Sequence, residues 1–480
     1  MIDPLQHERS QVLLSAGRQV LELFADMQAT PERFPLWHAH DAIAERVDAP
    51  QPLTADGQPL GDTLAAAIEL MSAGLCNVSH PKYFGYISPK PHPATVLGDL
   101  LGSALNQTPG AWRAGPSATM IEAEVLHALR GLFDLPPVQG RLPGGIFTGG
   151  GTLANLIGLK LAREHWQARV GRDIPFSRAR VYMSREGHFS VAKALDVLGF
   201  DPQVLVSVEV DSQGALQVGA LTAQLAADIA QGLSPMCVIG MLGTTATGAI
   251  DPLQAIADCA RQHDLWFHVD AAAGLALAAL PEARAMMRGL READSITFDP
   301  CKWMFAAFGV GCLLVRNGEL LAGSFWSGGP YWEEKGELDT FKMNLYGTRQ
   351  FRSLGLWCLL RHLGEQGYRQ ALRGMTAAAA SLREQVRADT RYSLVPDQGL
   401  MPVLAFRPRA ASDQQVRQLV ELCQQRDLGY PSLLDWQGRQ YLRVAVSNPD
   451  TGVAHMHAFK QSLDGLLGEL ALLSDHEVQP

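Results

Sequence analysis

The sequence predicts an α/β fold built on a mostly parallel sheet that helices cover on both faces. From Gly144, short apolar runs of strand length alternate with helical stretches over about 170 residues, and this alternation is typical of parallel sheets. Polar residues follow several of the runs, and open α/β sheets bind ligands at the carboxyl ends of their strands. We expect an N-terminal helical arm over residues 1–84, a large α/β domain over 85–364 and a smaller α+β domain over 365–480.

Length and composition bound the class of protein. The 480 residues are 47% hydrophobic and 19% charged, which is enough to bury a large core. A formal net charge of −9 argues against nucleic acid as a partner. The seven cysteines are scattered without metal-ligand spacing, which favours a reducing, cytoplasmic setting and no structural metal. We expect neither a signal peptide nor a membrane span, because the N-terminus lacks a basic start and the apolar tracts are short.

The first part of the chain reads as a helical arm. Apolar residues recur at helical spacing over residues 10–27 and 60–75, and prolines interrupt the segment 31–59 between them. A helix with an apolar stripe cannot bury that stripe alone. The arm must therefore lie on the main domain or on a partner subunit, and we favour the partner.

Two loops are candidates for binding a substrate. The segment 80–89 is aromatic and punctuated by proline and glycine, with Tyr86 and Ile87 near its end. Trp112 and Arg113 lie in a loop rich in glycine and proline. Aromatic side chains can line a pocket and an arginine can bind a carboxylate. A packed loop and a solvated arginine explain the same residues more simply.

A glycine-rich turn predicts an anion site. Residues 145–148 read as a short strand, and Gly149, Gly150, Gly151 and Thr152 lead from it into a helix. Backbone N–H groups at a helix start bind anions, and glycines expose them. The turn also matches G-x-G-x-x-A, the dinucleotide fingerprint, but no clear acidic residue ends a second strand about 20 residues later. We therefore expect a single phosphate and disfavour an NAD-dependent oxidoreductase.

The alternation of strands and helices continues beyond this turn. Strands are expected at 180–183, 203–210 and 236–242, and His188 opens a helix after the first of them. Thr244 follows the last of the three. Because parallel strands end at one edge of a sheet, His188 and Thr244 should lie at the same edge.

Two residues at that edge carry the chemistry. Asp270 ends an apolar strand at 265–269, and Lys302 follows a second strand at 294–298, with an alanine-rich segment at 271–291 that we expect to be a return helix. A lysine amine can bind a carbonyl cofactor covalently, and burial favours its neutral, nucleophilic form. A carboxylate facing a pyridine nitrogen keeps that nitrogen protonated, which makes the ring an electron sink. We therefore predict that Asp270 and Lys302 hold the two ends of pyridoxal 5'-phosphate (PLP), with Lys302 as its Schiff base. Each residue alone also fits a helix cap or a snorkelling side chain.

Three segments carry a family resemblance: His-Val-Asp-Ala-Ala at 268–272, Asp-Pro-Cys-Lys-Trp at 299–303, and Gly-Thr-Thr-Ala-Thr-Gly-Ala-Ile-Asp-Pro at 243–252. With them the chain, from about His80 to its C-terminus, resembles the group II PLP-dependent amino acid decarboxylases. This family includes the aromatic-L-amino-acid, histidine and glutamate decarboxylases. The resemblance implies PLP-dependent transferase fold type I, the aspartate-aminotransferase-like fold, in a homodimer with active sites at the interface.

The resemblance also implies residue roles and a reaction. Lys302 would carry the cofactor, Asp270 would pair with the pyridinium nitrogen, and His188 and Ala272 would lie on the two faces of the ring. The remaining cofactor-binding residues would be Gly150, Gly151 and Thr152 at the phosphate, Thr244 near the ring substituents, and Asp299. The implied reaction is PLP-dependent decarboxylation of an L-amino acid to the amine and CO2, in which His188 orients the carboxylate.

Substrate choice and two departures from the family leave alternatives open. Cys301 stands where many members have His, and Leu153 where an acidic residue often follows the phosphate-binding residue. The aromatic residues near position 86 favour an aromatic L-amino acid. However, Ile87 and Gly110 replace phenylalanines that aromatic decarboxylases tend to place in the pocket. If Arg113 points inward, an acidic substrate such as aspartate, glutamate or cysteine sulfinate becomes an alternative, and a diamino acid is a further one.

A third departure concerns the proton donor. Family members protonate the carbanion with a Tyr on a mobile loop, here 324–348, and that position falls near Phe341. A phenyl ring cannot donate a proton, and in plant relatives Phe at this position accompanies oxygen-dependent formation of an aldehyde. Tyr331 and Tyr346 lie some residues away, and Tyr346 is our candidate for the donor. A cofactor-free interaction protein on the same scaffold is disfavoured, because Lys302 and its partners persist.

The C-terminal part reads as a smaller α+β unit. A helical stretch at 365–387 leads to expected strands at 393–395, 403–407 and 441–446 and a helix at 413–426. Arg443, on the last strand, is expected to pack between domains rather than to act chemically.

Overall fold

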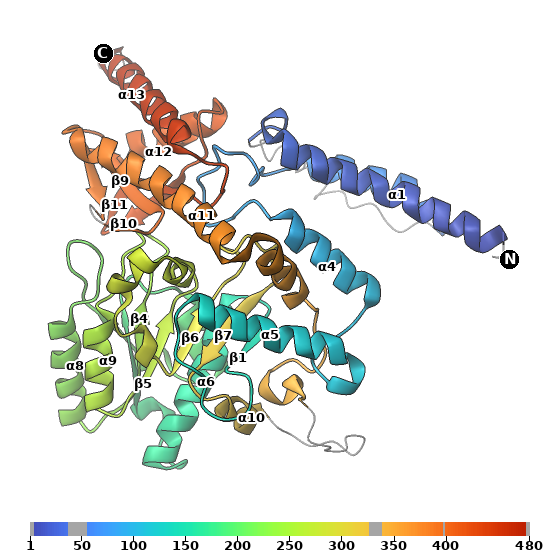
Figure 1. Ribbon diagram of the computed structural model, residues 1–480. Helices are drawn as coiled ribbons and strands as arrows, with labels where there is room; N and C mark the ends of the chain where they lie inside the picture. The colour runs from blue at the N-terminus through green and yellow to red at the C-terminus, as the bar shows by residue number, and fades with distance from the viewer. Residues whose placement is uncertain (1–3, 37–54, 326–337, 397–398, 477–480) are drawn as a thin grey trace.

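Two sheets and the helices around them make up the chain in a computed structural model that describes residues 4–36, 55–325, 338–396 and 399–476 (Figure 1). The strands of the larger sheet are β1 (Gly145–Thr148), β2 (Ala179–Ser184), β3 (Leu205–Val208), β4 (Ser234–Met241), β5 (Trp266–Asp270), β6 (Ser295–Phe298) and β7 (Gly311–Val315). They lie in the order β1-β7-β6-β5-β4-β2-β3. β7 pairs antiparallel with β1 and β6, and the other neighbours pair in parallel. The mostly parallel sheet predicted from the sequence is confirmed.

Helices cover both faces of this sheet, because alternate residues of its buried strands point in opposite directions. The covering helices are α6 (Gly151–Val170) and α7 (Ser190–Val197) on one face and α8 (Val218–Ala230) and α9 (Leu253–Gln262) on the other. Ile239 and Trp266 belong to the buried apolar cluster that includes α6 and α7. Val238 and Phe267, their chain neighbours, belong to the cluster that includes α8 and α9.

The first part of the chain is helical. The helices before the first strand are α1 (Pro4–Ala29), α3 (Leu60–Ala73), α4 (Pro93–Leu105) and α5 (Pro116–Leu132), with the short 3-10 helices η1 (Pro31–Arg33) and η2 (Trp112–Ala114). Figure 1 shows α1, in blue, extending away from the body of the molecule. Its Leu13 and Leu14 are 62% and 64% exposed, so the apolar stripe that the sequence predicted is uncovered. Within the described residues, no helix has both the length and the apolar character that a bilayer span requires.

The connection between β5 and β6 differs from the prediction. The alanine-rich segment 271–291 was expected to be a return helix, and it instead forms three short 3-10 helices, η5 (Gly274–Ala279), η6 (Pro281–Met287) and η7 (Leu290–Glu292). Pro281 cannot continue a preceding helix, and Gly289 has a φ of +90° that interrupts the next one. The prediction of a single helix was wrong because tight packing against the sheet overrides alanine's helix propensity. At Gly274, for example, an added Cβ would lie 2.2 Å from the carbonyl oxygen of Leu242.

The remaining short elements connect the strands of the large sheet and follow β7. They are η3 (Phe176–Arg178), η4 (Pro202–Val204), α10 (Glu319–Phe325) and η8 (Thr340–Met343).

The C-terminal part holds the second sheet, which is antiparallel throughout its described pairs. Its strands are β8 (Tyr392–Val395), β9 (Val403–Pro408), β10 (Ser432–Trp436) and β11 (Arg439–Ala445), in the order β10-β11-β9-β8, with α11 (Ser353–Ala388), α12 (Asp413–Gln425) and α13 (Val453–His476). The sequence did not predict β10, an edge strand whose residues are mostly half-buried or exposed. Inside α11, Gly364 leaves the helical conformation, with φ 59° and ψ 179°. This break coincides with the predicted end of the large domain, although the three domain boundaries stay a prediction.

Arg443 ties the second sheet to the first. Its side chain is buried, its Nε donates to the carbonyl oxygens of Thr245 (2.8 Å) and Ala246 (3.2 Å), and its Nη1 donates to that of Tyr86 (3.2 Å). These three carbonyls belong to segments beside the carboxyl ends of the large sheet. The contacts agree with the packing role that we expected for Arg443.

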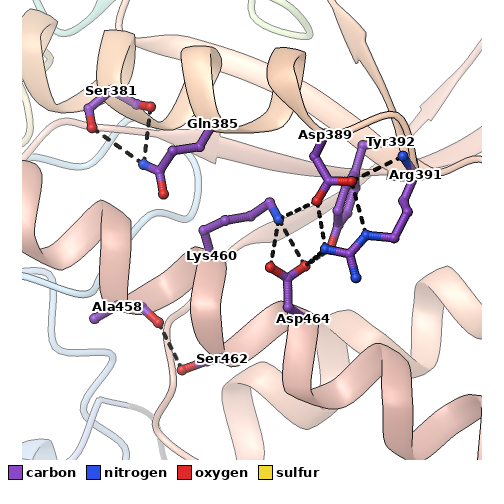
Figure 2. Close-up of polar contacts among 9 residues, drawn as sticks. All are labelled: Ser381, Gln385, Asp389, Arg391, Tyr392, Ala458, Lys460, Ser462 and Asp464. Atoms are coloured by element: carbon purple, nitrogen blue, oxygen red, sulfur yellow. Dashed lines mark hydrogen bonds and ion pairs between the residues drawn. The ribbon is translucent and has the colours of Figure 1, made fainter.

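A network of charges fastens α13 to the junction between α11 and β8 (Figure 2). Lys460, on α13, lies 2.9 Å from Asp389 and 2.8 Å from Asp464. Arg391 pairs with the same two carboxylates, at 2.6 and 2.8 Å. The hydroxyl of Tyr392 donates to Asp464 (3.0 Å). The Lys460 side chain is only 7% exposed, so removing its charge leaves two carboxylates short of a partner in a mostly buried place.

We expect Lys460→Met to lower the free energy of unfolding by about 3 kcal/mol, because it removes one partner of a buried ion pair. Hydrogen bonds from the side chains of Arg391 and then Lys460 hold the pKa of Asp389 below its usual range, against the opposing effect of burial. The stabilisation is therefore present above the unfolded pKa of about 3.9 and is lost as the pH falls through the lower native pKa. Urea unfolding at several pH values measures the free energy of unfolding. The difference in that free energy between wild type and variant should become smaller in acid.

Arg426→Met is the matched control for this prediction. Arg426 lies 2.8 Å from Glu469 on α13, and both side chains are about half exposed. An exposed pair contributes less than about 1 kcal/mol. A loss in Lys460→Met no larger than that in Arg426→Met would contradict the prediction.

Candidate active site

A cavity of about 320 Å³ lies at the carboxyl ends of β1, β4, β5 and β6. Small-molecule sites typically measure roughly 300–1,000 Å³. The cavity lining includes nine residues that the sequence predicted as site residues: Ile87, Gly150, Gly151, Thr152, His188, Asp270, Ala272, Asp299 and Lys302.

Asp270 reaches the cavity because β5 ends there. On this strand Trp266, His268 and Asp270 are two residues apart and therefore face the same side of the sheet, toward α6. The Asp270 side chain is 3% exposed. Its Oδ2 accepts a hydrogen bond from Nδ2 of Asn155 on α6 (2.9 Å), and its Oδ1 accepts one from the backbone N–H of Ala272 (3.2 Å). The carboxylate is thus held in place at the cavity wall.

His188 is connected to the same asparagine. Nδ2 of Asn155 lies 2.9 Å from the hydroxyl of Ser190, which lies 2.7 Å from Nδ1 of His188. Burial lowers the pKa of His188 below its usual value, and the negative charge of Asp270 only partly opposes this effect. The imidazole is therefore neutral near neutral pH. A flat, neutral ring at the cavity wall is suited to stack on a planar ligand.

Lys302 lies on a short turn that follows β6. Oδ1 of Asp299 accepts from the backbone N–H of Cys301 (3.0 Å), and the thiol of Cys301 donates to the carbonyl oxygens of Ala307 (3.2 Å) and Val310 (3.1 Å). On the far side, the indole of Trp303, 0% exposed, donates to the carbonyl oxygen of Val446 next to β11 (2.9 Å). The backbone is fixed on both sides of the lysine.

The amine of Lys302 is left for a ligand. Nζ makes no hydrogen bond with any residue of the part of the chain that the structure describes, and Lys302 lines the cavity. Burial raises the pKa of the neighbouring Asp299, an effect that the charge of Lys302 opposes. An amine next to a buried cavity is the group that captures a carbonyl compound.

The glycine turn forms the cavity wall at the start of α6. Gly150 has a φ of +144°, a conformation that favours glycine. The adjoining strand approaches it closely, since a Cβ on Gly311 would lie 2.3 Å from the carbonyl carbon of Gly150. The first N–H groups of α6, a helix of 20 residues, have no partner within their own helix, which makes the turn an anion site.

These residues fit PLP. The amine of Lys302, the carboxylate of Asp270, the imidazole of His188 and the anion-binding turn before Thr152 line one cavity, and they match the aldehyde, the pyridine nitrogen, the ring face and the phosphate of that cofactor. Ala272, also in the lining, offers a small apolar contact to the second face.

The structure places some predicted residues elsewhere. Thr244 is fully buried in the turn after β4, where its Oγ1 accepts from the N–H of Ala249 (3.0 Å), and its neighbour Thr245 lines the cavity instead. Trp112 and Arg113 lie in η2, away from the cavity lining, and the backbone N–H of Trp112 donates to Oδ1 of Asp339 (3.1 Å).

The aromatic candidates near the site also lie outside the cavity lining. Tyr86 is 64% exposed and has a φ of 50°, and the next residue, Ile87, reaches the cavity. Tyr346 lines a smaller cavity of about 210 Å³ that shares Gly149 and Gly309 with the first. Phe341 lies in η8, where its backbone N–H donates to the carbonyl oxygen of Gly110 (2.9 Å). Tyr331 lies outside the described residues.

Three residues at the site were missed by the sequence reasoning: Asn155, Ser190 and His268. Asn155 and His268 are 1% and 0% exposed. The signal was the alternation of polar and aromatic residues at 266, 268 and 270 within an otherwise apolar strand, which marks one face as functional. The partner on α6 carried no comparable signal.

The comparisons with known proteins agree with this chemistry. The family model described as Pyridoxal-dependent decarboxylase conserved domain matches residues 47–409. The aromatic-L-amino-acid decarboxylase of Bacillus atrophaeus is 30% identical over 413 residues, 83% of each chain. A phenylacetaldehyde synthase from a Rosa hybrid cultivar is 27% identical over 441 residues, 90% of this chain and 86% of its own.

The structural comparison confirms fold type I. The crystal structure of Oryza sativa TDC with PLP and tryptamine matches with a TM-score of 0.90 and 26% identity, over 98% of this chain and 100% of that one. The family model covers most of the chain, and the relatives match it over most of their own length. Both findings point to the same family. The chain belongs to the pyridoxal-dependent decarboxylases and is a PLP-dependent amino acid decarboxylase.

Proposed function

We propose that the enzyme removes the carboxylate of an aromatic L-amino acid and releases the corresponding amine and CO2. The observation that carries this proposal is the shared cavity of Lys302, Asp270 and His188. One proton enters the product for each CO2 that leaves, so the site must also hold a proton donor.

The residues of the site divide this work. Lys302 would supply the amine that holds PLP by its aldehyde. Bound PLP supplies the electron sink for the bond to the departing carboxylate. Asp270 holds a proton on the ring nitrogen, and its buried carboxylate keeps this interaction strong. His188 fixes the ring from one face and orients the carboxylate of the substrate.

Exposed aromatic rings support an aromatic substrate. Phe308 lines the cavity although it is 63% exposed, and Phe189, 62% exposed, contacts His188 with ring centroids 4.1 Å apart and the rings tilted by 37°. Aromatic side chains that remain exposed next to a cavity favour an apolar, flat ligand. The similarity to an aromatic-L-amino-acid decarboxylase and to a structure containing tryptamine supports the same class. Tyr346, beside the adjoining cavity, is our candidate proton donor.

We also propose a homodimer in a reducing compartment such as the cytoplasm. Large apolar side chains of α1 and α4 are exposed: Val12, Leu13, Leu14, Val20, Leu21, Leu97, Leu100, Leu101 and Leu105. Apolar surface of this extent marks an interface. Seven free cysteines, five of them buried, support the compartment. A monomer of 52.0 kDa in light scattering of the PLP-loaded enzyme would contradict the dimer.

A substrate panel tests the function. The purified enzyme with PLP is given L-tryptophan, L-tyrosine, L-phenylalanine, L-glutamate, L-aspartate and L-2,4-diaminobutyrate, and CO2, amine, aldehyde and peroxide are measured together. We expect amine and CO2 in equal amounts from an aromatic substrate, with kcat/KM at least about tenfold above the acidic and diamino acids, the scale of one good pocket contact. Aldehyde and peroxide in place of amine would instead establish the oxygen-dependent reaction, and turnover of the acidic amino acids alone would refute the aromatic proposal.

A further inference from the structure

A chain of hydrogen bonds lies under the cavity, between α6 and the sheet. Trp266 and His268 share the face of β5 that carries Asp270, and Ser295 on β6 is the register partner of His268. Nε1 of Trp266 lies 2.8 Å from Oγ of Ser295, which lies 2.7 Å from Nδ1 of His268. Nε2 of His268 lies 3.0 Å from Oδ1 of Asn155.

The site is built to admit this chain. Gly158, one turn after Asn155 on α6, faces the imidazole, and a Cβ there would lie 2.8 Å from Cε1 of His268. Any other residue at this position would push the ring away. His268 and Ser295 are both 0% exposed, so each polar atom must find its partner within the protein.

The donors and acceptors of this chain can have only one direction. The indole N–H of Trp266 can only donate, so Oγ of Ser295 accepts from it. Because a serine oxygen can accept two hydrogen bonds, the tautomer of His268 is set from the other end of the chain. The carboxylate of Asp270 can only accept, so Nδ2 of Asn155 faces it and Oδ1 of Asn155 faces Nε2 of His268. Burial lowers the pKa of His268 to about 4, so its imidazole is neutral and carries one hydrogen. That hydrogen must lie on Nε2, which donates to Oδ1 of Asn155 and has the hydroxyl of Thr297 as a longer second contact at 3.4 Å.

Asn155 passes the direction on to both catalytic groups. Because its Oδ1 accepts from His268, its Nδ2 is the atom that faces Asp270 and Ser190, and it donates one hydrogen to each (2.9 Å in both cases). Ser190 then donates its own hydrogen to Nδ1 of His188 (2.7 Å), and the backbone N–H of Ser190 points at the same nitrogen (3.3 Å). The neutral His188 therefore carries its hydrogen on Nε2.

We propose that Asn155 and His268 are positioning residues. Through the hydrogen-bond chain that includes Trp266, they fix both the orientation of the Asp270 carboxylate and the tautomer of His188. The role toward PLP rests on the proposed function, whereas the direction of the chain does not. A flipped amide would bring the carbonyl oxygen of Asn155 to 2.9 Å from the carboxylate and would leave Ser190 without a donor. His268 also opposes that flip, because the flipped amide would set its Nδ2 donor against the N–H on Nε2 of His268.

The alternative is that these polar groups only satisfy one another while α6 packs on the sheet. In that case each polar group needs a hydrogen-bond partner, but the position of the hydrogen on His188 does not depend on Asn155. Substituting Asn155 with Asp separates the two ideas. The new side chain is the same size and still accepts from His268. Its second oxygen lies beside the carboxylate of Asp270, so the two carboxyl groups share one proton, and no hydrogen remains to donate to Ser190. Ser190 would then donate to the new carboxylate and accept from His188, so the hydrogen of His188 would move to Nδ1.

Nitrogen-15 NMR of histidine side chains reads the tautomers directly. The full-length protein with labelled histidine is measured with and without PLP, at a pH above the usual histidine pKa of about 6.5. His188→Gln and His268→Gln samples assign the two signals among the 14 histidines. We expect both rings of the wild type to carry hydrogen on Nε2 alone. A wild-type His268 with hydrogen on Nδ1, or doubly protonated, would overturn the inference.

The variant and its control complete the test. We expect Asn155→Asp to give His188 a hydrogen on Nδ1 and to weaken PLP binding, followed by visible absorbance, by about tenfold or more, since a hydrogen bond to a charged group is lost. Asn448→Asp is the control, because Asn448 is also fully buried and donates only to the backbone oxygen of Ser79 (2.9 Å). It should leave the His188 signal unchanged. An unchanged His188 tautomer in Asn155→Asp would refute the positioning role even if the substrate panel succeeds, and a failed panel leaves the NMR result intact.

Discussion

Replacing Lys302 with alanine is expected to abolish the covalent link between protein and cofactor. The visible absorbance of the PLP-loaded enzyme and its trapping by borohydride should both disappear, because Lys302 is the lysine that the described residues bring to the cavity lining. We expect kcat/KM to fall by roughly 10³-fold or more, the scale seen when a covalent catalytic group is removed. Absorbance, mass spectrometry of the borohydride-treated protein and the CO2 assay measure the three effects.

Lys82→Ala serves as the control for this prediction. Lys82 donates to the carbonyl oxygen of Asp427 (3.2 Å) at the surface, away from the cavity lining. Its removal should change neither the absorbance nor the trapped mass. Borohydride labelling that persists in Lys302→Ala would show that another lysine carries the cofactor, and it would remove the basis of the proposed chemistry.

Replacing Asp270 with asparagine is the second large effect that we expect. The amide keeps the size of the side chain and can still accept from Asn155, but it has no charge with which to hold a proton on the ring nitrogen. Losing one preorganised electrostatic contact at a reacting group costs about 2.7–4 kcal/mol, or roughly 10²–10³ in kcat. PLP should still bind through Lys302 and the glycine turn, so the visible band should remain while turnover falls.

Asp251→Asn separates this effect from a general loss of stability. Asp251 is also buried near the carboxyl edge of the sheet, where it accepts from the N–H groups of Leu216 and Met241 (2.8 Å each). In Asp251→Asn one of these two N–H groups loses its acceptor, because an amide has a single oxygen, so the variant loses stability at a place outside the cavity lining. We expect kcat within about twofold of wild type in Asp251→Asn. An equal fall of kcat in both variants would mean that buried aspartates matter here for folding alone.

The sequence could predict those parts of the site that follow from the ends of single strands. Asp270 ends one strand and Lys302 comes four residues after the end of the next, so the parallel sheet brings both to one edge. Thr244 and Thr245 show the limit of this reasoning. In the irregular turn after β4 a shift of one residue decides which side chain reaches the cavity, and backbone hydrogen bonds set that register.

Contacts between elements could not be predicted in the same way. Asn155 meets Asp270 across 115 positions of the chain, and nothing in the local pattern of α6 indicates which turn faces β5. The prediction of a helix over 271–291 was wrong for a related reason. Its alanines favour a helix, but its close approach to Leu242 does not permit one. Local propensity decides the existence of most elements, and tertiary packing decides their details.

The contacts of Trp303 and Arg443 affect how the protein unfolds. The antiparallel sheet contributes no side chain to the lining of the described cavity. However, Trp303 donates to the carbonyl oxygen of Val446 beside that sheet, and Arg443 on the sheet donates to that of Thr245. Loss of that sheet would remove the contacts that hold both the turn of Lys302 and the loop of Thr245. We therefore expect the two sheets to unfold together, and proteolytic removal of the antiparallel sheet to abolish activity although that sheet does not line the cavity.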